Sequence, residues 1–286
     1  MDAGMTDCQP ISDTDTACSG GERYTHGYHQ VIVGWHSRRT AEACAAFLLP
    51  RLRPDAEVLD IGCGSGTITT GLARRASRVV GLDMSAEVVD AARAHAAECG
   101  LANASFEVGS VYELPWDDKS FDVVYAHQVL QHLSDPVRAL KEARRVLRPG
   151  GIVAVRDSDY ETMVHAPVFP AIERWRDLYH QVASANGGEA DAGRYLPSWV
   201  AEAGFTNVET TASTTAHTDQ EGRTVWGEMW AVRVIDSDFA NHAISNGFAT
   251  RNELQEISDA FRQWAAQPDG FWAWINGETI GVCPPA

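Results

Sequence analysis

Residues 58–66 read Val-Leu-Asp-Ile-Gly-Cys-Gly-Ser-Gly, an apolar stretch that runs directly into three glycines at alternate positions. The pattern predicts a short buried strand followed by a tight turn, in which backbone amides can approach a ligand because no Cβ stands in the way. A second apolar stretch ends in Asp83, seventeen residues beyond Gly66, and its carboxylate is placed to accept both hydroxyls of a ribose. With a helix expected at 67–75, these pieces form a βαβ unit that holds a nucleotide-type ligand at the mouth of a parallel sheet.

The spacing of the glycines narrows the choice of ligand. A dinucleotide-binding turn has the form G-x-G-x-x-G, with a pyrophosphate at the start of the following helix. Here the third glycine, Gly66, comes one residue early, and Thr67 occupies the place of the final glycine. A nicotinamide dehydrogenase on the same fold is therefore disfavoured, although the glycines alone do not exclude it.

Three further segments occur in a fixed order after this unit. They are Val108-Gly109-Ser110-Val111-Tyr112-Glu113-Leu114-Pro115, Phe121-Asp122-Val123-Val124-Tyr125-Ala126-His127 and Leu147-Arg148-Pro149-Gly150-Gly151. With the glycine turn and Asp83, they resemble the class I S-adenosylmethionine (SAM) methyltransferases. The closest likeness is to the small-molecule branch that contains the ubiquinone and menaquinone biosynthesis enzymes, and it covers about residues 56–157.

The resemblance implies SAM as cofactor and assigns its contacts. Gly62, Gly64 and Gly66 would approach the methionyl part, and Asp60 would orient its amino group. Asp83 would hold the ribose hydroxyls, and Met84 would lie on one face of adenine. Ser110 stands where many relatives carry an acid for the adenine amino group, with Val111 beside it, so that polar contact is in doubt. Arg39 or Arg38 is a candidate for the SAM carboxylate, but a solvated helix face explains either one.

Candidate catalytic residues follow from the same comparison. His127 ends the fourth expected strand, where the family places residues close to the sulfonium, so it is expected to contact SAM and the acceptor and to take the acceptor's proton. Tyr24 and His29 belong to an aromatic and imidazole cluster on a segment that the family folds across the cofactor as a lid. Each of these side chains could instead satisfy a local hydrogen bond, and only the backbone of His127 could touch SAM.

Composition limits the classes of partner. The chain has 286 residues, 44% of them hydrophobic, and a formal net charge of −16. Such a charge repels phosphodiester backbones and anionic lipid, so we expect a small-molecule acceptor, no nucleic acid and no membrane. Six cysteines without C-x-x-C spacing are expected to be free thiols, and no metal site is expected. No signal-peptide pattern opens the chain, which makes the cytoplasm the default location, and the oligomeric state is left open.

The expected fold is α/β: a doubly wound, Rossmann-like, seven-stranded and mostly parallel sheet with an N-terminal helical lid and a helical cap insertion. Residues 1–22 are expected to form a disordered tail, 23–55 the lid helices, 56–160 the SAM-binding core, and 161–286 the substrate cap with the last strands of the same domain. Strands are expected near 57–61, 78–83, 104–108, 121–127, 151–157, 207–213 and 271–283.

Helices are expected near 40–49, 67–75, 86–99, 137–147, 169–184, 223–235 and 250–266, with a glycine-rich loop at 187–193. Asn276-Gly277 indicates a turn within the last strand. Trp226, Met229, Trp230 and Val234 follow helical spacing, which favours core packing over an aromatic acceptor site. The function predicted from these patterns is methyl transfer from SAM to a small molecule. A SAM-fold protein with other chemistry, or a non-catalytic SAM-binding protein, is the alternative.

Overall fold

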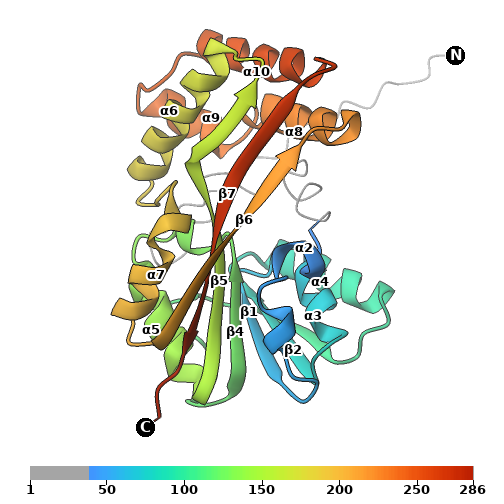
Figure 1. The fold of residues 1–286 in the computed structure, drawn as a ribbon, viewed down its shortest axis with the longest axis vertical. Coiled ribbons are helices and arrows are strands. Elements are labelled where there is room, and N and C mark those ends of the chain that lie inside the picture. The colour runs from blue at the N-terminus through green and yellow to red at the C-terminus, as the bar shows by residue number, and fades with distance from the viewer. Residues whose placement is uncertain (1–38, 286) are drawn as a thin grey trace, which may run out of the picture.

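One seven-stranded sheet organises the molecule (Figure 1). The computed structural model describes residues 39–285, and the sheet order is β3-β2-β1-β4-β5-β7-β6. The strands are β1 Glu57–Ile61, β2 Arg78–Asp83, β3 Ala104–Val108, β4 Phe121–His127, β5 Leu147–Ala166, β6 Thr206–His217 and β7 Phe271–Val282. Neighbouring strands from β3 to β5 pair in parallel, whereas β7 is antiparallel to both β5 and β6. The predicted seven-stranded, mostly parallel sheet is confirmed.

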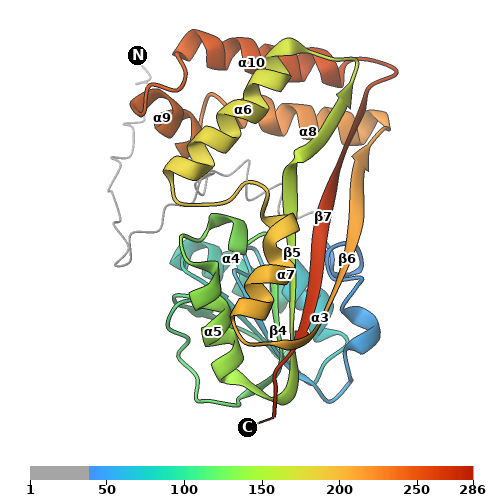
Figure 2. The same ribbon diagram turned by 60° about the vertical axis from the view of Figure 1, so that its left-hand side comes forward.

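Helices cover both faces of the lower part of the sheet (Figure 2). One core joins α2 Ala41–Cys44 and α3 Thr67–Ala73 to β1, β2 and β4, and α4 Ala86–Glu98 packs on β2 and β3. The opposite face is covered by α5 Pro136–Val146 and α7 Ala192–Glu202. Ser85 accepts a hydrogen bond from the Val88 amide at the start of α4, as its position predicts. The sheet is thus doubly wound, and the strand order reverses between β1 and β4, where such folds bind ligands.

A helical cap stands beyond the carboxyl ends of the parallel strands. The long strands β5, β6 and β7 extend past the others and lead into it (Figure 1). Its helices are α6 Pro170–Ala185, α8 Gln220–Arg233, α9 Asp238–Ser245 and α10 Arg251–Ala265, of which the last three lie between β6 and β7 in the chain. The insertion between the last two strands therefore supplies three of the four cap helices, and α6, which follows β5, supplies the fourth. Within residues 39–285, none of the helices combines the length and apolar character needed to cross a membrane.

Aromatic side chains fill the cap. Trp175, Trp230, Trp264 and Trp272 are fully buried there, and the rings of Tyr160 and Tyr179 stack with centroids 3.9 Å apart. The helical stripe expected to serve core packing is buried in the same cluster, which confirms that interpretation; its members are Trp226, Met229, Trp230 and Val234. Aromatic rings contribute large buried areas, so this cluster holds the cap helices together.

Three local predictions are wrong. The helix expected at 40–49 is only α2, which ends where Ala45 leaves helical backbone geometry at φ −121°, followed by the 3₁₀ turn η1 Leu49–Arg51. The turn expected at Asn276-Gly277 is absent from the described strand, and β7 runs straight through it. A Cβ at Gly277 would overlap the carbonyl of Gly193, so this glycine serves close packing against α7. Gly193 itself lies inside α7, not in a loop.

Candidate functional site

The three glycines of the turn after β1 differ in their surroundings. All three have positive φ, with Gly62 at 66°, Gly64 at 53° and Gly66 at 76°. A Cβ on Gly62 would overlap the Val129 side chain, and one on Gly66 would lie 2.9 Å from Ala92 Cβ. A Cβ on Gly64 would meet no atom within 4 Å. Gly62 and Gly66 therefore permit close packing, whereas Gly64 presents bare backbone to open space.

Asp83 joins this turn to the end of β2. Its Oδ2 accepts a hydrogen bond from the Gly64 amide at 3.1 Å, and its Oδ1 accepts one from the Ser85 amide at 3.1 Å. A carboxylate has about four acceptor sites, more than these two amides use. The structure thus brings together the two features on which the nucleotide-type site was predicted.

Asp60 lies beneath the turn and is only 2% exposed. Its Oδ2 accepts a 2.6 Å hydrogen bond from the Thr69 hydroxyl. Burial raises the pKa of Asp60 to about 7, with the nearby charge of Asp83 adding to the effect and the Thr69 hydrogen bond opposing it. A cationic group bound next to Asp60 would favour its ionised form, so the expected contact with the amino group of SAM stays a chemically sound prediction.

The residues expected near adenine lie at the carboxyl ends of β2 and β3. Met84 follows Asp83 directly and is 36% exposed, an apolar surface beside a polar turn. Ser110 is exposed and accepts a hydrogen bond from the Tyr112 amide at 3.2 Å, while Val111 packs against the sheet core. Open space at Gly64, a carboxylate at Asp83 and a thioether at Met84 match the chemistry of an adenosine with an amino-acid tail.

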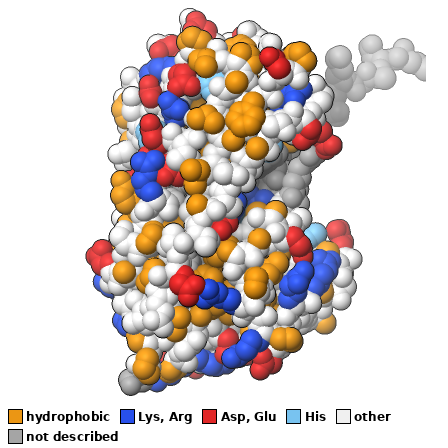
Figure 3. Space-filling view, in the orientation of Figure 1, with side chains coloured by type: hydrophobic (Ala, Val, Ile, Leu, Met, Phe, Trp, Pro, Cys, Tyr) orange, Lys and Arg blue, Asp and Glu red, His pale blue; other side chains and the backbone are white. Residues whose placement is uncertain are grey.

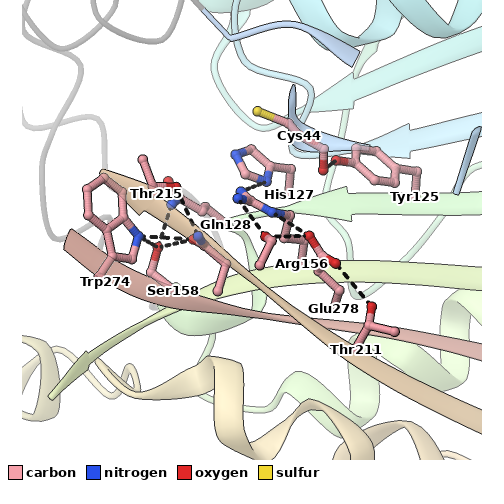
Figure 4. A network of polar contacts seen from close by, with 12 residues as sticks. Cys44, Tyr125, His127, Gln128, Arg156, Ser158, Thr211, Thr215, Trp274 and Glu278 are labelled. Carbon is pink, nitrogen blue, oxygen red and sulfur yellow. Dashed lines mark hydrogen bonds and ion pairs between the residues drawn. The ribbon is translucent and has the colours of Figure 1, made fainter. Parts of the chain in front are cut away.

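His127 lies at the end of β4 and is buried, and Figure 4 shows it next to Arg156. Its Nδ1 is 3.4 Å from Nη1 of Arg156. Because a guanidinium only donates hydrogen bonds, Nδ1 acts as the acceptor, and the neutral imidazole carries its hydrogen on Nε2. This arrangement favours an orienting role over the proton-accepting role expected from the sequence, and the catalytic role of His127 stays a prediction. Tyr24 and His29 lie outside the described residues.

Arg156 belongs to a buried ion pair that the sequence interpretation missed. Its Nε donates to Glu278 Oε1 on β7 at 3.2 Å, and both side chains are less than 10% exposed. On β6, the hydroxyls of Ser213 and Thr211 donate to the two oxygens of the same carboxylate (Figure 4). An arginine inside an otherwise apolar expected strand was the available signal, because a buried charge requires a partner.

Gln128, the next residue after His127, is a second feature that the sequence did not reveal. Its backbone is left-handed, with φ at 53°. Its carboxamide oxygen accepts a hydrogen bond from Arg39, and its Nε2 donates to the Ser158 hydroxyl at 2.7 Å. Left-handed non-glycine residues are uncommon and occur often at functional sites.

Burial shifts the pKa values of two groups near this edge toward their neutral forms. Burial raises the pKa of Asp157 to about 8, and lowers that of His132 to about 3 with the charges of Arg233 and Arg39 acting in the same direction. Asp157 is fully buried on β5, and its Oδ1 faces the Gln131 amide at 3.4 Å. Gln131 Nε2 lies 3.1 Å from His132 Nε2, which therefore accepts a hydrogen bond. Burial therefore favours the neutral form of both Asp157 and His132, beside the charges of Arg39 and Arg233.

One group of His, Asp and Glu side chains in the described residues has ligand atoms that all lie within 4.8 Å of one another: Glu161, His180 and Asp191. His180 Nδ1 lies 2.8 Å from the Arg176 carbonyl, so it donates there, and Nε2 faces Asp191 at 3.0 Å. The hydrogen bond with Asp191 raises the pKa of His180, although burial opposes the rise. We interpret the group as an ion pair between α6 and the start of α7.

Comparison with known proteins identifies the fold family. A family described as "Methyltransferase domain" matches residues 52–207. The chain is 33% identical over 270 residues to "Uncharacterized methyltransferase C1B3.06c" of Schizosaccharomyces pombe, covering 90% of this chain and 95% of that protein. It is 30% identical over 274 residues to "Probable methyltransferase ltbC" of Aspergillus luteorubrus, covering 90% and 96%. A ubiquinone biosynthesis O-methyltransferase of Coxiella burnetii matches at 35% identity over 94 residues, 33% of this chain and 40% of that enzyme.

Solved structures agree on the fold. The YcgJ protein of Bacillus subtilis superposes with a TM-score of 0.55 at 19% identity, covering 88% of this chain and all of that one. The [4+2]-cyclase SpnF superposes with a TM-score of 0.51 at 22% identity, covering 93% and 90%. The glycine turn, the carboxylate that ends β2, the family match and the full-length relatives agree: the chain belongs to the class I SAM-dependent methyltransferases, and SAM is its cofactor.

Proposed function

We propose that this methyltransferase acts on a small organic acceptor bound between the glycine turn and the aromatic cap. The observation that carries the proposal is the position of α8, α9 and α10, which the chain inserts between β6 and β7 and which the long strands hold beyond the carboxyl edge of the sheet. A cap at this edge, where doubly wound folds bind ligands, can enclose a molecule and exclude water.

The proposed cofactor contacts follow the polarity of the site. Gly62, Gly64 and Gly66, with Asp60, serve the amino-acid part. Asp83 serves the ribose, which is consistent with its two amide donors fixing the carboxylate at the end of β2. The adenine part is served by Met84, Ser110 and Val111.

Bound SAM supplies an electrophilic methyl group, and the protein's task is then approach, alignment and exclusion of water. His127, held by Arg156, orients groups at the end of β4. Tyr24 and His29 are proposed to contact the acceptor from the N-terminal segment. Under this proposal the enzyme needs no strong base when the acceptor is already nucleophilic at neutral pH.

The net charge of the protein favours a small acceptor over a polyanionic one. The net charge is −16, and acidic and basic side chains are interspersed over the face drawn in Figure 3. Binding to nucleic acid is dominated by lysine and arginine contacts with phosphates, which an acidic chain opposes. Because the match to a ubiquinone biosynthesis O-methyltransferase spans only 94 residues, 33% of this chain, that relative's acceptor is a starting point for a screen and no more.

The test is a screen of phenols, amines, thiols and carboxylic acids with SAM, in which release of S-adenosylhomocysteine and the methylated product are both followed by mass spectrometry. The proposal predicts that at least one acceptor gains one methyl group in step with S-adenosylhomocysteine. Tight binding of SAM with conversion of an acceptor but no methyl gain would favour other chemistry on this fold, such as that named for SpnF. Binding without any turnover would favour a non-catalytic role.

A further inference from the structure

Gln128 is held in an unfavourable backbone conformation at the carboxyl end of β4. Its φ of 53° is left-handed, and its amide donates to the Arg156 carbonyl at 2.7 Å. A residue that carries a Cβ rarely adopts this conformation, so surrounding contacts must fix it. The conformation turns the chain sharply between His127 and Val129.

Directional hydrogen bonds fix the orientation of the Gln128 carboxamide (Figure 4). Nε2 donates to Ser158 Oγ, which in turn donates to Asn276 Oδ1 at 3.1 Å. Trp274 Nε1 donates to both of these oxygens, and Asn276 Nδ2 donates to Thr215 at 3.0 Å. With the amide nitrogen committed to Ser158, the amide oxygen must point the other way, and there it accepts a hydrogen bond from Nη2 of Arg39.

Arg39 is thereby anchored beside the glycine turn. Val129 follows Gln128 in the chain, and its side chain occupies the space that a Cβ on Gly62 would need. The charge of Arg39 acts on the buried Asp157 of β5, and the acids at the turn itself are Asp60 and Asp83, whose charges interact with each other. These acids suit an ammonium group and hydroxyls, but they repel a carboxylate, so a ligand that carries both charges needs a cation close by.

We propose that Gln128 is a positioning residue that presents the Arg39 guanidinium to the carboxylate of the amino-acid part of SAM. The inference rests on the proposed cofactor site. A guanidinium binds a carboxylate through paired hydrogen bonds whose geometry is exacting, and a neutral carboxamide holds the arginine without neutralising it. Gln128 therefore acts through Arg39 and does not itself touch the reacting atoms.

Two ligands separate this role from a general effect on the site. S-adenosylhomocysteine carries the amino-acid part, whereas 5′-methylthioadenosine keeps the adenosine and lacks the carboxylate. Calorimetric titration of both ligands into Gln128→Leu should show S-adenosylhomocysteine binding about 10–100-fold more weakly and 5′-methylthioadenosine binding as in the wild type. Arg39→Met should give the same pattern, and the double variant should lose no more than Arg39→Met alone, because both changes remove one interaction.

Gln128→Glu is a second variant for the case in which Gln128→Leu does not fold. It keeps a hydrogen-bonding side chain of the same size, but its carboxylate neutralises Arg39. It should weaken S-adenosylhomocysteine without changing 5′-methylthioadenosine, at an unchanged melting temperature. The control is Gln255→Leu, an exposed glutamine of α10 that bonds to Asp259, and it should change neither affinity. Equal weakening of both ligands in the Gln128 variants, unchanged S-adenosylhomocysteine affinity, or additive losses in the double variant would each overturn the inference. Failure of the wild type to bind either ligand would instead contradict the cofactor site itself.

Discussion

The cofactor half and the cap half of this enzyme are built by different means. In the cofactor half, made of β1–β4 and the glycine turn, short aliphatic strands end in glycines and acids, and Gly64 and Asp83 meet at the edge. In the cap half, made of α6, α8–α10 and the upper parts of β5–β7, most of the fully buried large side chains are aromatic. The Coxiella burnetii enzyme matches 94 residues, whereas the two full-length relatives match both halves.

The difference separates binding of the cofactor from choice of the acceptor. Under the proposed cofactor contacts, bare backbone and carboxylates would recognise parts that every SAM molecule carries, so that half can be shared widely. A packed aromatic cap has a shape set by its own side chains, and it can differ between enzymes without altering the glycine turn. Changes in the cap should therefore affect stability and acceptor choice, and changes at the turn should affect the cofactor.

The largest effect is expected for Trp175→Ala in the cap. Trp175 is fully buried, and its ring contacts those of Trp230 and Phe261. The substitution should lower the free energy of unfolding by about 3–5 kcal/mol, measured by denaturant titration, because it leaves a large cavity. Affinity for S-adenosylhomocysteine, measured where the variant is folded, should not change. The partly buried Trp199→Ala is the control and should cost less. If Trp175→Ala also weakened the binding of S-adenosylhomocysteine, the cap and the cofactor site would not be independent.

Gly64→Val tests the cofactor half. The branched side chain would occupy the open space at Gly64 and should weaken S-adenosylhomocysteine by about 100-fold or more, roughly 2.7 kcal/mol. The matched control is Gly100→Val, which has a similar left-handed backbone with φ at 67° and equally open surroundings at the end of α4. Both variants should lose similar amounts of melting temperature, and only Gly64→Val should lose the ligand. Equal ligand affinity in the two would place the cofactor elsewhere.

His127→Gln should have a smaller effect. Because Arg156 donates to Nδ1 of His127, we expect the side chain to orient and not to accept a proton. Turnover of the variant should stay within about tenfold of the wild type, well short of the ~10²–10⁴-fold loss caused by removing a general base. The check is rate against pH from about 5.5 to 9 with the acceptor found in the screen. A wild-type rate that rises through about pH 6.5, with the rise lost in the variant, would restore the general-base role.

Stability should also depend on pH through Asp157. Its pKa in the folded state, about 8, lies above the ordinary value near 4, so between these values the folded state keeps a proton that the unfolded state has lost. The free energy of unfolding should therefore fall as pH rises from about 4 to 8. Asp157→Asn should flatten this slope, because an amide does not titrate in this range. Exposed Asp55→Asn is the control, and equal slopes in all three proteins would contradict the assignment.

Much of the cofactor half could be predicted from sequence because its signals are local. The bounds of β1, β2, β3 and β4 agree with expectation, and Gly64 and Asp83 lie within one βαβ unit. The helix α9 is not predicted from the sequence, and the helix predicted at 40–49 is longer than the observed α2. Tertiary packing, and not the local sequence pattern, decides whether such short segments are helical.

The polar network behind the site could not be predicted in the same way. Arg156 and Glu278 are 122 residues apart, and they meet only because β7 pairs with β5. The hydrogen bond from Ser158 to Asn276 depends on the same pairing of β5 with β7. The local Asn276-Gly277 pattern carries no information about this distant partner and predicts a turn instead. An arginine in a buried strand predicts that a partner exists, but it does not say which residue provides it.

The role of Asp83 can be measured by titrating S-adenosylhomocysteine into the wild type and Asp83→Ala. We expect tight binding to the wild type and a loss of about 10–100-fold in the variant, because charge-assisted hydrogen bonds to the ribose disappear together with the acceptor of the Gly64 amide. Asp90→Ala, which removes an exposed aspartate of α4, should bind as the wild type does. Unchanged affinity in a folded Asp83→Ala protein would contradict the assignment of this edge as the cofactor site.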